Sequence, residues 1–338
     1  MKSHTKYYFI LITLILVFFI IDLNIGSYYI SFKDILSAIF GGDVESENIK
    51  TIVLEFRLPR AITAAITGMA LSVCGLLMQS YFRNPLAGPY VLGVSSGASF
   101  GVAVFLLLGS SVVAGFGNIG MSVFALAGSF FTMFVLLTFG KSFKGNASLL
   151  IIGLMLSIFL GALINILEYF SKPNELQSFV LWTFGSLNGV EWKELLIIIP
   201  VISVALLYTF KLTKPLNAIL LGERYAQSMG ISIEKLKWQI IIITTILTAI
   251  ITAYCGPIAF IGIATPHLVR YWIKTSNHAI ILPLVILTGT LIMLICDILS
   301  QVPGFSFVLP INVITSLFGA PIVILVIIKN MKQYTINE

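Results

Sequence analysis

The sequence predicts an all-α integral membrane protein of about ten transmembrane helices. Hydrophobic residues make up 58% of the 338 residues, charged residues only 10%, and the mean hydropathy is +1.03. A chain of this composition cannot keep its apolar surface from water in a soluble fold. At roughly 20 apolar residues per span, it has room for about ten helices and none for a soluble domain. We therefore expect a single transmembrane domain over residues 1–338.

Ten apolar runs can be followed along the chain. They lie near residues 7–23, 58–81, 88–109, 119–140, 147–168, 194–210, 238–254, 257–271, 279–298 and 307–328. The first run shows no small-residue cleavage site after it, so we expect a retained helix instead of a signal peptide. The eighth is short and contains Gly262 and Pro266, which predicts a broken helix. Such backbone is tolerated only where protein or a cavity surrounds it.

Charge distribution predicts the orientation. If both termini are cytoplasmic, the inner face carries fourteen of the twenty Lys and Arg residues but only three of the fourteen acidic ones. This is the positive-inside bias of membrane proteins. The net charge of +6 is then explained by topology. Because no basic cluster lies on a polar, foldable segment, we expect no nucleic-acid partner.

Several chemical functions are excluded by the residues present. Gly140-Lys141-Ser142 resembles the end of a phosphate-binding loop, but Val135 stands where the first glycine is needed. Cys74, Cys255 and Cys296 are widely spaced within or beside apolar runs, which predicts buried thiols and no metal site. His267 is more simply a structural residue than a haem or metal ligand. We expect no catalytic residue, metal site or bound cofactor in this chain.

Small and polar residues line one face of two predicted spans. The second span carries Ala64, Gly68, Ser72, Gly75 and Gln79, and the fifth carries Gly153, Ser157, Gly161, Asn165 and Glu168. Close helix packing explains such a face. The alternative is that Ser157, Asn165 and Glu168 line a transport path, because polar groups at depth tend to face a cavity.

Residues 211–237 form the longest predicted cytoplasmic segment, which we expect to fold as two short helices. Pro215 would open the first, Gly230 would end it, and Ser232 would cap the second. The first helix is amphipathic, so one alternative is that it lies on the lipid surface.

Arg57 and Arg60 stand at the predicted start of the second span. A spacing of three places them on one side of a helix. Positive charge is unfavourable at a helix N-terminus, so we expect a compensating partner. Lipid phosphates and Glu55 are the simplest candidates.

Three motifs carry a resemblance to a known family: FRLPR at 56–60, GLLMQSYFRNPLAGPYVLGVSSGAS at 75–99 and CGPIAFIGIATPHLVR at 255–270. In this respect the chain resembles the FecCD-type membrane permeases, which import iron-siderophores, haem and vitamin B12 with an ATPase partner. The resemblance implies a fold like that of the vitamin B12 importer permease, with helices 2–5 and 7–10 as inverted halves.

The resemblance also implies partners and site residues. The family's LGE…G coupling signature matches Leu221, Gly222, Glu223 and Gly230, and Arg224 lies beside it; this loop docks on an ATPase subunit, which holds the ATP and Mg. Arg57 and Arg60 match arginines that receive acidic residues from an extracytoplasmic substrate-binding protein. A third basic residue usually follows the ninth helix, where this chain has Gln301.

We therefore expect the permease subunit of an ATP-driven importer in the bacterial plasma membrane, paired with a second copy of itself or with a paralogous permease. The resemblance favours an iron(III)-siderophore as cargo, with haem or cobalamin as alternatives. An ion-coupled secondary transporter is the rival from another class. It needs acidic residues at mid-membrane, whereas Glu168 and Asp297 lie near span ends.

Overall fold

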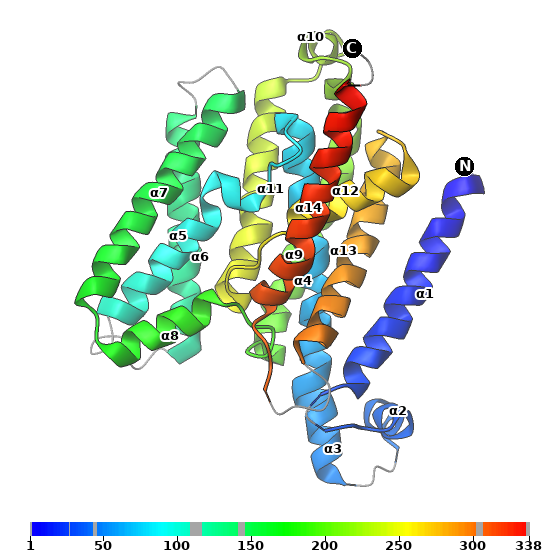
Figure 1. Ribbon diagram of the computed structural model, residues 1–338, viewed down its shortest axis with the longest axis vertical. Coiled ribbons are helices and arrows are strands. Elements are labelled where there is room, and N and C mark those ends of the chain that lie inside the picture. Colours follow the sequence, from blue (N-terminus) through cyan, green and yellow to red (C-terminus); the bar gives the residue numbers. More distant parts are fainter. Residues whose placement is uncertain are drawn as a thin grey trace. The chain divides into compact units, whose positions relative to one another are not determined.

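The computed structural model describes residues 2–26, 28–42, 46–108, 117–140, 146–301 and 307–335. Helices account for nearly all of this part of the chain, and no strand occurs in it (Figure 1). Seven of the described helices are long and apolar enough to cross a membrane, and Val94–Leu107 and Ile311–Leu325 are shorter apolar helices. Each of the ten predicted runs contains a helix, while the number that cross the membrane remains a prediction.

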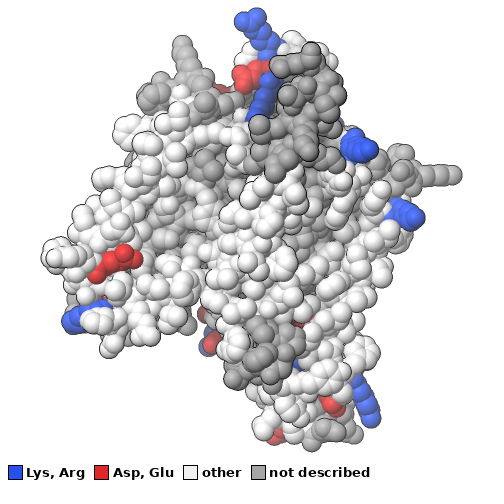
Figure 2. All heavy atoms as spheres, in the orientation of Figure 1, with Lys and Arg blue, Asp and Glu red and all other residues white. Residues whose placement is uncertain are grey.

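The surface matches a membrane environment. On the face drawn in Figure 2, charged side chains are sparse and most of the described surface is uncharged. Exposed apolar side chains are numerous, and on the predicted first span they include Phe9 at 69% and Leu16 at 60%. Such faces are stable against lipid and unstable against water.

The chain forms two compact units, each assembled from separate stretches of sequence. Unit 1 contains Met1–Val73, Leu187–Ile199 and Ala259–Glu338, and unit 2 contains Cys74–Ser186 and Pro200–Ile258. The helices α4 (Leu58–Phe82) and α9 (Trp192–Leu220) each contribute residues to both units.

In unit 1, α1 (Lys2–Asn24) packs along α13 (His278–Ser300), and α12 (Ile261–Ile273) packs on α13 and α14 (Ile311–Thr335). The small residues of α4 meet α13 closely. A Cβ atom added to Gly68 would lie 2.6 Å from Met293 Cβ, and one added to Gly289 would lie 2.6 Å from Ser72 Cβ. Close packing is thus confirmed for this part of the predicted stripe.

The helix that carries the two arginines begins before them, so the predicted start at Arg57 is wrong. Helix α3 (Glu47–Thr51) continues through a π-helical turn, η1 (Ile52–Arg57), into α4, and the three form 36 continuous helical residues. No residue between them stops a helix. The unfavourable dipole effect expected at a helix N-terminus therefore does not apply to Arg57.

The proline that follows the π turn leaves a carbonyl group of this turn without a backbone donor. The Leu58 amide reaches back five residues to the Val53 carbonyl. In the same register the Leu54 carbonyl would accept from residue 59, but Pro59 has no N–H. The indole Nε1 of Trp192 donates to this carbonyl instead, at 2.8 Å.

A helix that the sequence did not predict, α2 (Phe32–Phe40), lies between α1 and α3 in the chain. The Ser31 hydroxyl accepts a hydrogen bond from the Asp34 amide at 3.2 Å, and Gly41 ends the helix at a φ of +80°. Ile35 and Ala38 are buried in an apolar cluster of unit 1. The other members of this cluster are Leu23, Ile30, Ile49, Val53 and Ala61.

In unit 2, α5 (Val94–Ala103) and its π-helical extension η3 (Val104–Leu108) pack with α6 (Gly117–Phe139), α7 (Asn146–Phe170), α8 (Pro173–Thr183) and α11 (Ile233–Cys255). The predicted run 88–109 is divided: a 3-10 turn, η2 (Pro89–Leu92), ends at Gly93, where φ is +74°. Gly97 and Gly128 allow α5 and α6 to approach, since a Cβ on Gly97 would lie 3.0 Å from the Gly128 carbonyl carbon.

The break expected inside the eighth run occurs earlier than predicted. Gly262 and Pro266 both lie within α12. The non-helical backbone comes before it, where Gly256 and Phe260 have φ values of +73° and +67°. The Ala259 amide donates to the Asn312 side chain at 3.0 Å. This side chain satisfies a backbone group that the break releases.

Candidate functional site

Arg57 is the last residue of η1, and its guanidinium group closes the C-terminal end of α1. Its Nη1 donates to the carbonyl oxygens of Leu23 at 2.7 Å and Asn24 at 2.9 Å, and its Nη2 donates to that of Tyr28. A positive charge at a helix C-terminus is favourable, and terminal carbonyls need donors. The compensating partner of Arg57 is therefore the end of α1 and not Glu55.

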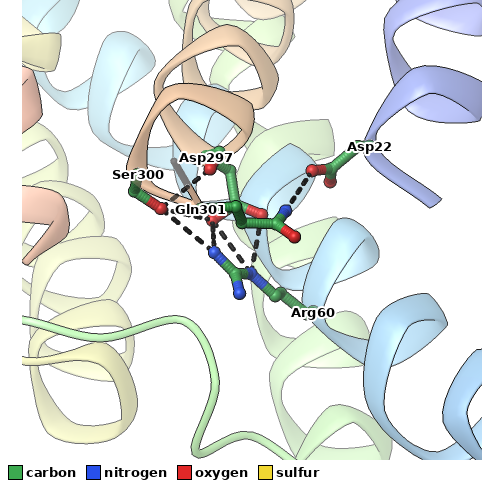
Figure 3. Close-up of polar contacts among 5 residues, drawn as sticks. All are labelled: Asp22, Arg60, Asp297, Ser300 and Gln301. Atoms are coloured by element: carbon green, nitrogen blue, oxygen red, sulfur yellow. Dashed lines mark hydrogen bonds and ion pairs between the residues drawn. The ribbon is translucent and has the colours of Figure 1, made fainter. Parts of the chain in front are cut away.

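Arg60, one turn further along, forms a bidentate ion pair with Asp297 of α13 (Figure 3). Its Nε lies 2.9 Å from Oδ2 and 3.1 Å from Oδ1 of the carboxylate, and its Nη2 lies 2.7 Å from Oδ1. Nη2 also donates to the Ser300 hydroxyl at 3.0 Å. The Asp297 side chain is 1% exposed and that of Arg60 13%. Removing one member of such a pair would leave a charge buried without its partner.

Gln301, at the position where the family resemblance suggests a basic residue, belongs to the same cluster. Its Nε2 donates to Asp22 Oδ1 at 2.8 Å, and both residues are buried. The second carboxylate oxygen of Asp22 has no hydrogen-bond partner within the described part of the protein. The cluster in Figure 3 thus joins side chains from α1, α4 and the end of α13.

A cavity of about 320 Å³ opens beside this cluster. Its lining combines charged and polar side chains with exposed aromatic ones: Asp22, Gly26, Tyr28, Ile52, Phe56, Arg57, Arg60, Asn188, Gln301 and Val308. All of these residues belong to unit 1. Arg60 Nη1 makes no hydrogen bond with any residue that the structure describes, so it is the donor of this guanidinium that remains for a ligand. The spacing in the sequence predicted that the two arginines lie together. It did not predict that Asp297 and Asp22 are their neighbours.

The predicted coupling segment has a different helical structure from the one expected. Helix α9 continues through Pro215 to Leu220, so Pro215 does not open a new helix. A turn at Leu221 and Gly222 follows, and then the six-residue helix α10 (Glu223–Ser228). Ser232 caps α11 as predicted, accepting from the Lys235 amide at 3.3 Å.

Two glycines fix the shape of this segment. Gly222 has a φ of +124° and Gly230 a φ of +81°, values that L side chains rarely adopt. Glu223, Arg224 and Gly230 are exposed, and Leu221 is 70% exposed. The end of α9 is supported by a residue that sequence reasoning missed, Arg83, whose Nη2 donates to the Ile219 carbonyl.

The polar face of α7 differs between its two ends. Ser157 is half-buried and donates to its own helix at the Gly153 carbonyl, 2.9 Å away. A Cβ added to Gly93 would lie 3.0 Å from both that carbonyl oxygen and Ser157 Oγ, so this end is tightly packed. Asn165 is exposed and Glu168 half-buried. Close packing is thus confirmed for the end at Gly153 and Ser157, while the lining of a transport path by Asn165 and Glu168 stays a prediction.

The remaining predictions concern the cysteines, the segment at Lys141 and Ser142, and possible metal ligands. All three cysteines are free and buried, as expected. Lys141 and Ser142 lie outside the described residues. Within the described ranges, no three His, Cys, Asp or Glu side chains are grouped so that they could hold a metal ion.

An apolar helical fold with seven candidate spans in the described part of the chain is typical of a multi-pass membrane protein. The chain belongs to the FecCD transport family, whose model matches residues 14–329. It is 32% identical over 291 residues to the vitamin B12 import system permease protein BtuC of Salmonella typhi and to that of Salmonella newport (strain SL254). Each alignment covers 86% of this chain and 88% of the relative.

Solved structures agree with this assignment. A chain from a structure described as an inward-facing conformation of a metal-chelate type ABC transporter matches with a TM-score of 0.85 and 30% identity, covering 96% of this chain and 99% of the other. A chain from PsaBC of Streptococcus pneumoniae, solved in complex with a Fab, shares the fold at a TM-score of 0.50 and 19% identity, covering 86% of this chain and 95% of the other. The protein is thus an ABC importer permease of the FecCD family, which excludes the ion-coupled secondary transporter.

Proposed function

We propose that this chain is the permease subunit of an importer for iron(III)-siderophore chelates in the bacterial plasma membrane, with both termini cytoplasmic. The observation that carries the proposal is the likeness, over 96% of the chain, to a metal-chelate type ABC transporter. A bulky hydrophilic chelate needs a wide, weakly binding path and no dedicated ligands. Cobalamin is the second candidate, because the relatives at 32% identity are named vitamin B12 permeases.

The proposed energy source is a dimer of ATPase subunits that hold ATP and Mg, because this chain has no phosphate-binding loop of its own. Leu221, Gly222, Glu223, Arg224 and Gly230 would contact the ATPase. The exposure of Leu221, Glu223, Arg224 and Gly230 supports this role. The hydrogen bonds from the Leu221 and Gly222 amides to Ala218 and Ile219, at the end of α9, support it as well. Closure of the ATPase dimer would displace this turn, and α9 would carry the displacement into the membrane.

The proposed extracytoplasmic partner is a substrate-binding protein that presents carboxylates to Arg57 and Arg60. Arginine suits this recognition because its planar group binds carboxylates through paired hydrogen bonds. The cavity beside Arg60 Nη1 would admit such a carboxylate. Because Asp297 and the end of α1 already bind most of the guanidinium donors, the partner would add to an existing network.

The proposed path runs between two permease copies, either identical or paralogous. Ser157, Asn165 and Glu168 of α7 would lie along it. The exposed Asn165 and the half-buried Glu168 would contact the cargo, while Ser157 lies in the packed part of the helix. The same proposal includes a single domain over residues 1–338. Within it, the second to fifth predicted spans and the seventh to tenth predicted spans would be inverted halves. Alternating access then requires rocking of these halves and no bond chemistry in the permease.

Transport assays with defined cargoes test the function. The permease would be reconstituted in proteoliposomes with its ATPase and its binding protein, and uptake of radiolabelled ferric siderophore, haem and cobalamin would be compared. We expect ATP-dependent uptake of the siderophore, which unlabelled siderophore inhibits and cobalamin does not. Uptake of cobalamin alone would replace the proposed cargo, and uptake without ATP would contradict the proposed mechanism.

A further inference from the structure

Helix α2 has three distinct faces. One turn of an α-helix takes 3.6 residues, so successive side chains are rotated by about 100°. Ile35 and Ala38 occupy the sector that is buried in unit 1. Lys33, Asp34 and Ser37 form a polar sector on another side. Between the two lies an exposed apolar sector: Phe32 is 48%, Leu36 39%, Ile39 37% and Phe40 82% exposed.

The direction of α2 also differs from that of its neighbours. In Figure 1, α2 is seen nearly end-on, whereas α1, α3 and α4 run within the plane of the picture. All four belong to unit 1 over the residues concerned. Since α1 and the helix that includes α4 are both candidate membrane spans, α2 would lie roughly parallel to the membrane surface.

Exposed apolar side chains also precede α2 in the chain. Val17 and Ile20, in the second half of α1, are 45% and 38% exposed. Beyond the end of α1, Tyr28 is 59% and Tyr29 74% exposed. Tyrosine is enriched where membranes meet water, because its ring is apolar and its hydroxyl polar. Exposed apolar side chains thus recur along the chain from the second half of α1, through two tyrosines, to Phe32 and Phe40.

We propose that α2 is an interfacial helix whose Phe32, Leu36, Ile39 and Phe40 insert between phospholipids at the boundary of headgroups and acyl chains. A helix with adjoining apolar and polar faces, lying in the membrane plane, has the geometry for this binding. Lys33, in the polar sector, would reach the lipid phosphates. The contact fixes the height of the α1–α4 pair in the bilayer, and with it the level of the Arg57 and Arg60 cavity. The inference requires only a membrane-spanning chain and is independent of the cargo.

Nitroxide scanning of the permease in nanodiscs of phosphatidylcholine and phosphatidylglycerol tests the proposal. Single variants Phe32→Cys, Leu36→Cys and Phe40→Cys would be labelled, with Lys33→Cys and Ser37→Cys as matched controls on the polar face. The native cysteines are buried, and the unsubstituted protein measures their background. We expect the ratio of collisions with oxygen to collisions with a water-soluble nickel chelate to be several-fold higher at 32, 36 and 40 than at 33 and 37.

A second measurement does not depend on labelling. Lipids brominated near the headgroup should quench the added fluorescence of Phe40→Trp more than lipids brominated at the chain end, while Ser37→Trp should respond to neither. Equal nickel accessibility on both faces, together with no quenching at position 40, would mean that α2 faces water and would overturn the proposal. A change of the label signals at 32, 36 and 40 only after adding the binding protein would assign this face to that partner instead.

Discussion

Asp297 binds two of the three guanidinium nitrogen atoms of Arg60, at distances of 2.7 to 3.1 Å. Within unit 1, this pair fixes α4 to α13 at the edge of the cavity. It also places a carboxylate of the permease on the arginine that we propose for docking. A carboxylate from the partner would therefore approach an Arg60 guanidinium whose positive charge Asp297 already largely balances.

Asp297 and a carboxylate of the binding protein would compete for Arg60, so the docking hypothesis predicts that removing the Asp297 charge strengthens binding. Asp297→Asn keeps the size of the side chain but removes its charge, so it should strengthen binding of the substrate-binding protein several-fold, and more at low salt than at high salt. The measurement is the dissociation constant of the permease in nanodiscs at two salt concentrations. Arg57→Gln should weaken the same binding. Dissociation constants that neither variant changes would leave Arg57 and Arg60 with a structural role alone.

The same pair should matter for stability. Asp297→Leu leaves Arg60 without a buried partner and should destabilise the fold by about 3–5 kcal/mol. Asp297→Leu combined with Arg60→Met should cost less than the sum of these two single changes. Unfolding in mixed micelles would give the four values of the cycle. Additive losses would show that the two side chains are not coupled.

Gly222 should be essential for coupling to the ATPase. Gly222→Ala places a Cβ on backbone with a φ of +124° and should distort the turn before α10, at a cost of about 1–3 kcal/mol. We expect reduced co-purification with the ATPase and reduced stimulation of ATP hydrolysis. Gly189→Ala is the matched control, since Gly189 is exposed, has no atom close to an added Cβ and lacks a positive φ.

Glu223→Ala with Arg224→Ala should uncouple transport without unfolding the protein.

Solvent access should divide α7 in two. Asn165→Cys and Glu168→Cys, in a background without native cysteines, should react with a membrane-impermeant thiol reagent if they line the path. Leu160→Cys should not react, because Leu160 is 1% exposed. Protection of all three positions would mean that this end of α7 is packed against another chain or against lipid.

Much of the fold could be predicted from hydropathy, because each apolar run of bilayer length must form a helix to satisfy its backbone in lipid. Helix ends were less predictable. The sequence predicts a helix start at Pro215, yet α9 passes through this residue. It also predicts a helix start at Arg57, whereas the helix begins ten residues earlier, at Glu47. Amphipathic α2 was missed because nine residues between polar loops give no span signal.

The candidate site could be predicted only in part. Motifs identified Arg57, Arg60 and the segment from Leu221 to Gly230, because local spacing is visible in a sequence. The pairing of Arg60 with Asp297 joins residues 237 positions apart. No periodicity reveals such a contact, since it depends on which helices become neighbours.

The π turn before Pro59 lets this helix tolerate a change of length that a regular helix would not. A π turn holds about one residue more than an α turn, so it absorbs the extra residue while the helix on either side keeps its facing. Deleting Glu55, within this turn, would let the helix close into regular α geometry and leave Ile49 on the side that it presents to the apolar cluster. Deleting one residue from the regular part of α4 would instead rotate everything before the deletion by about 100°. The loss of one codon is thus absorbed in the turn, whereas the same loss within α4 would misalign a whole helical face.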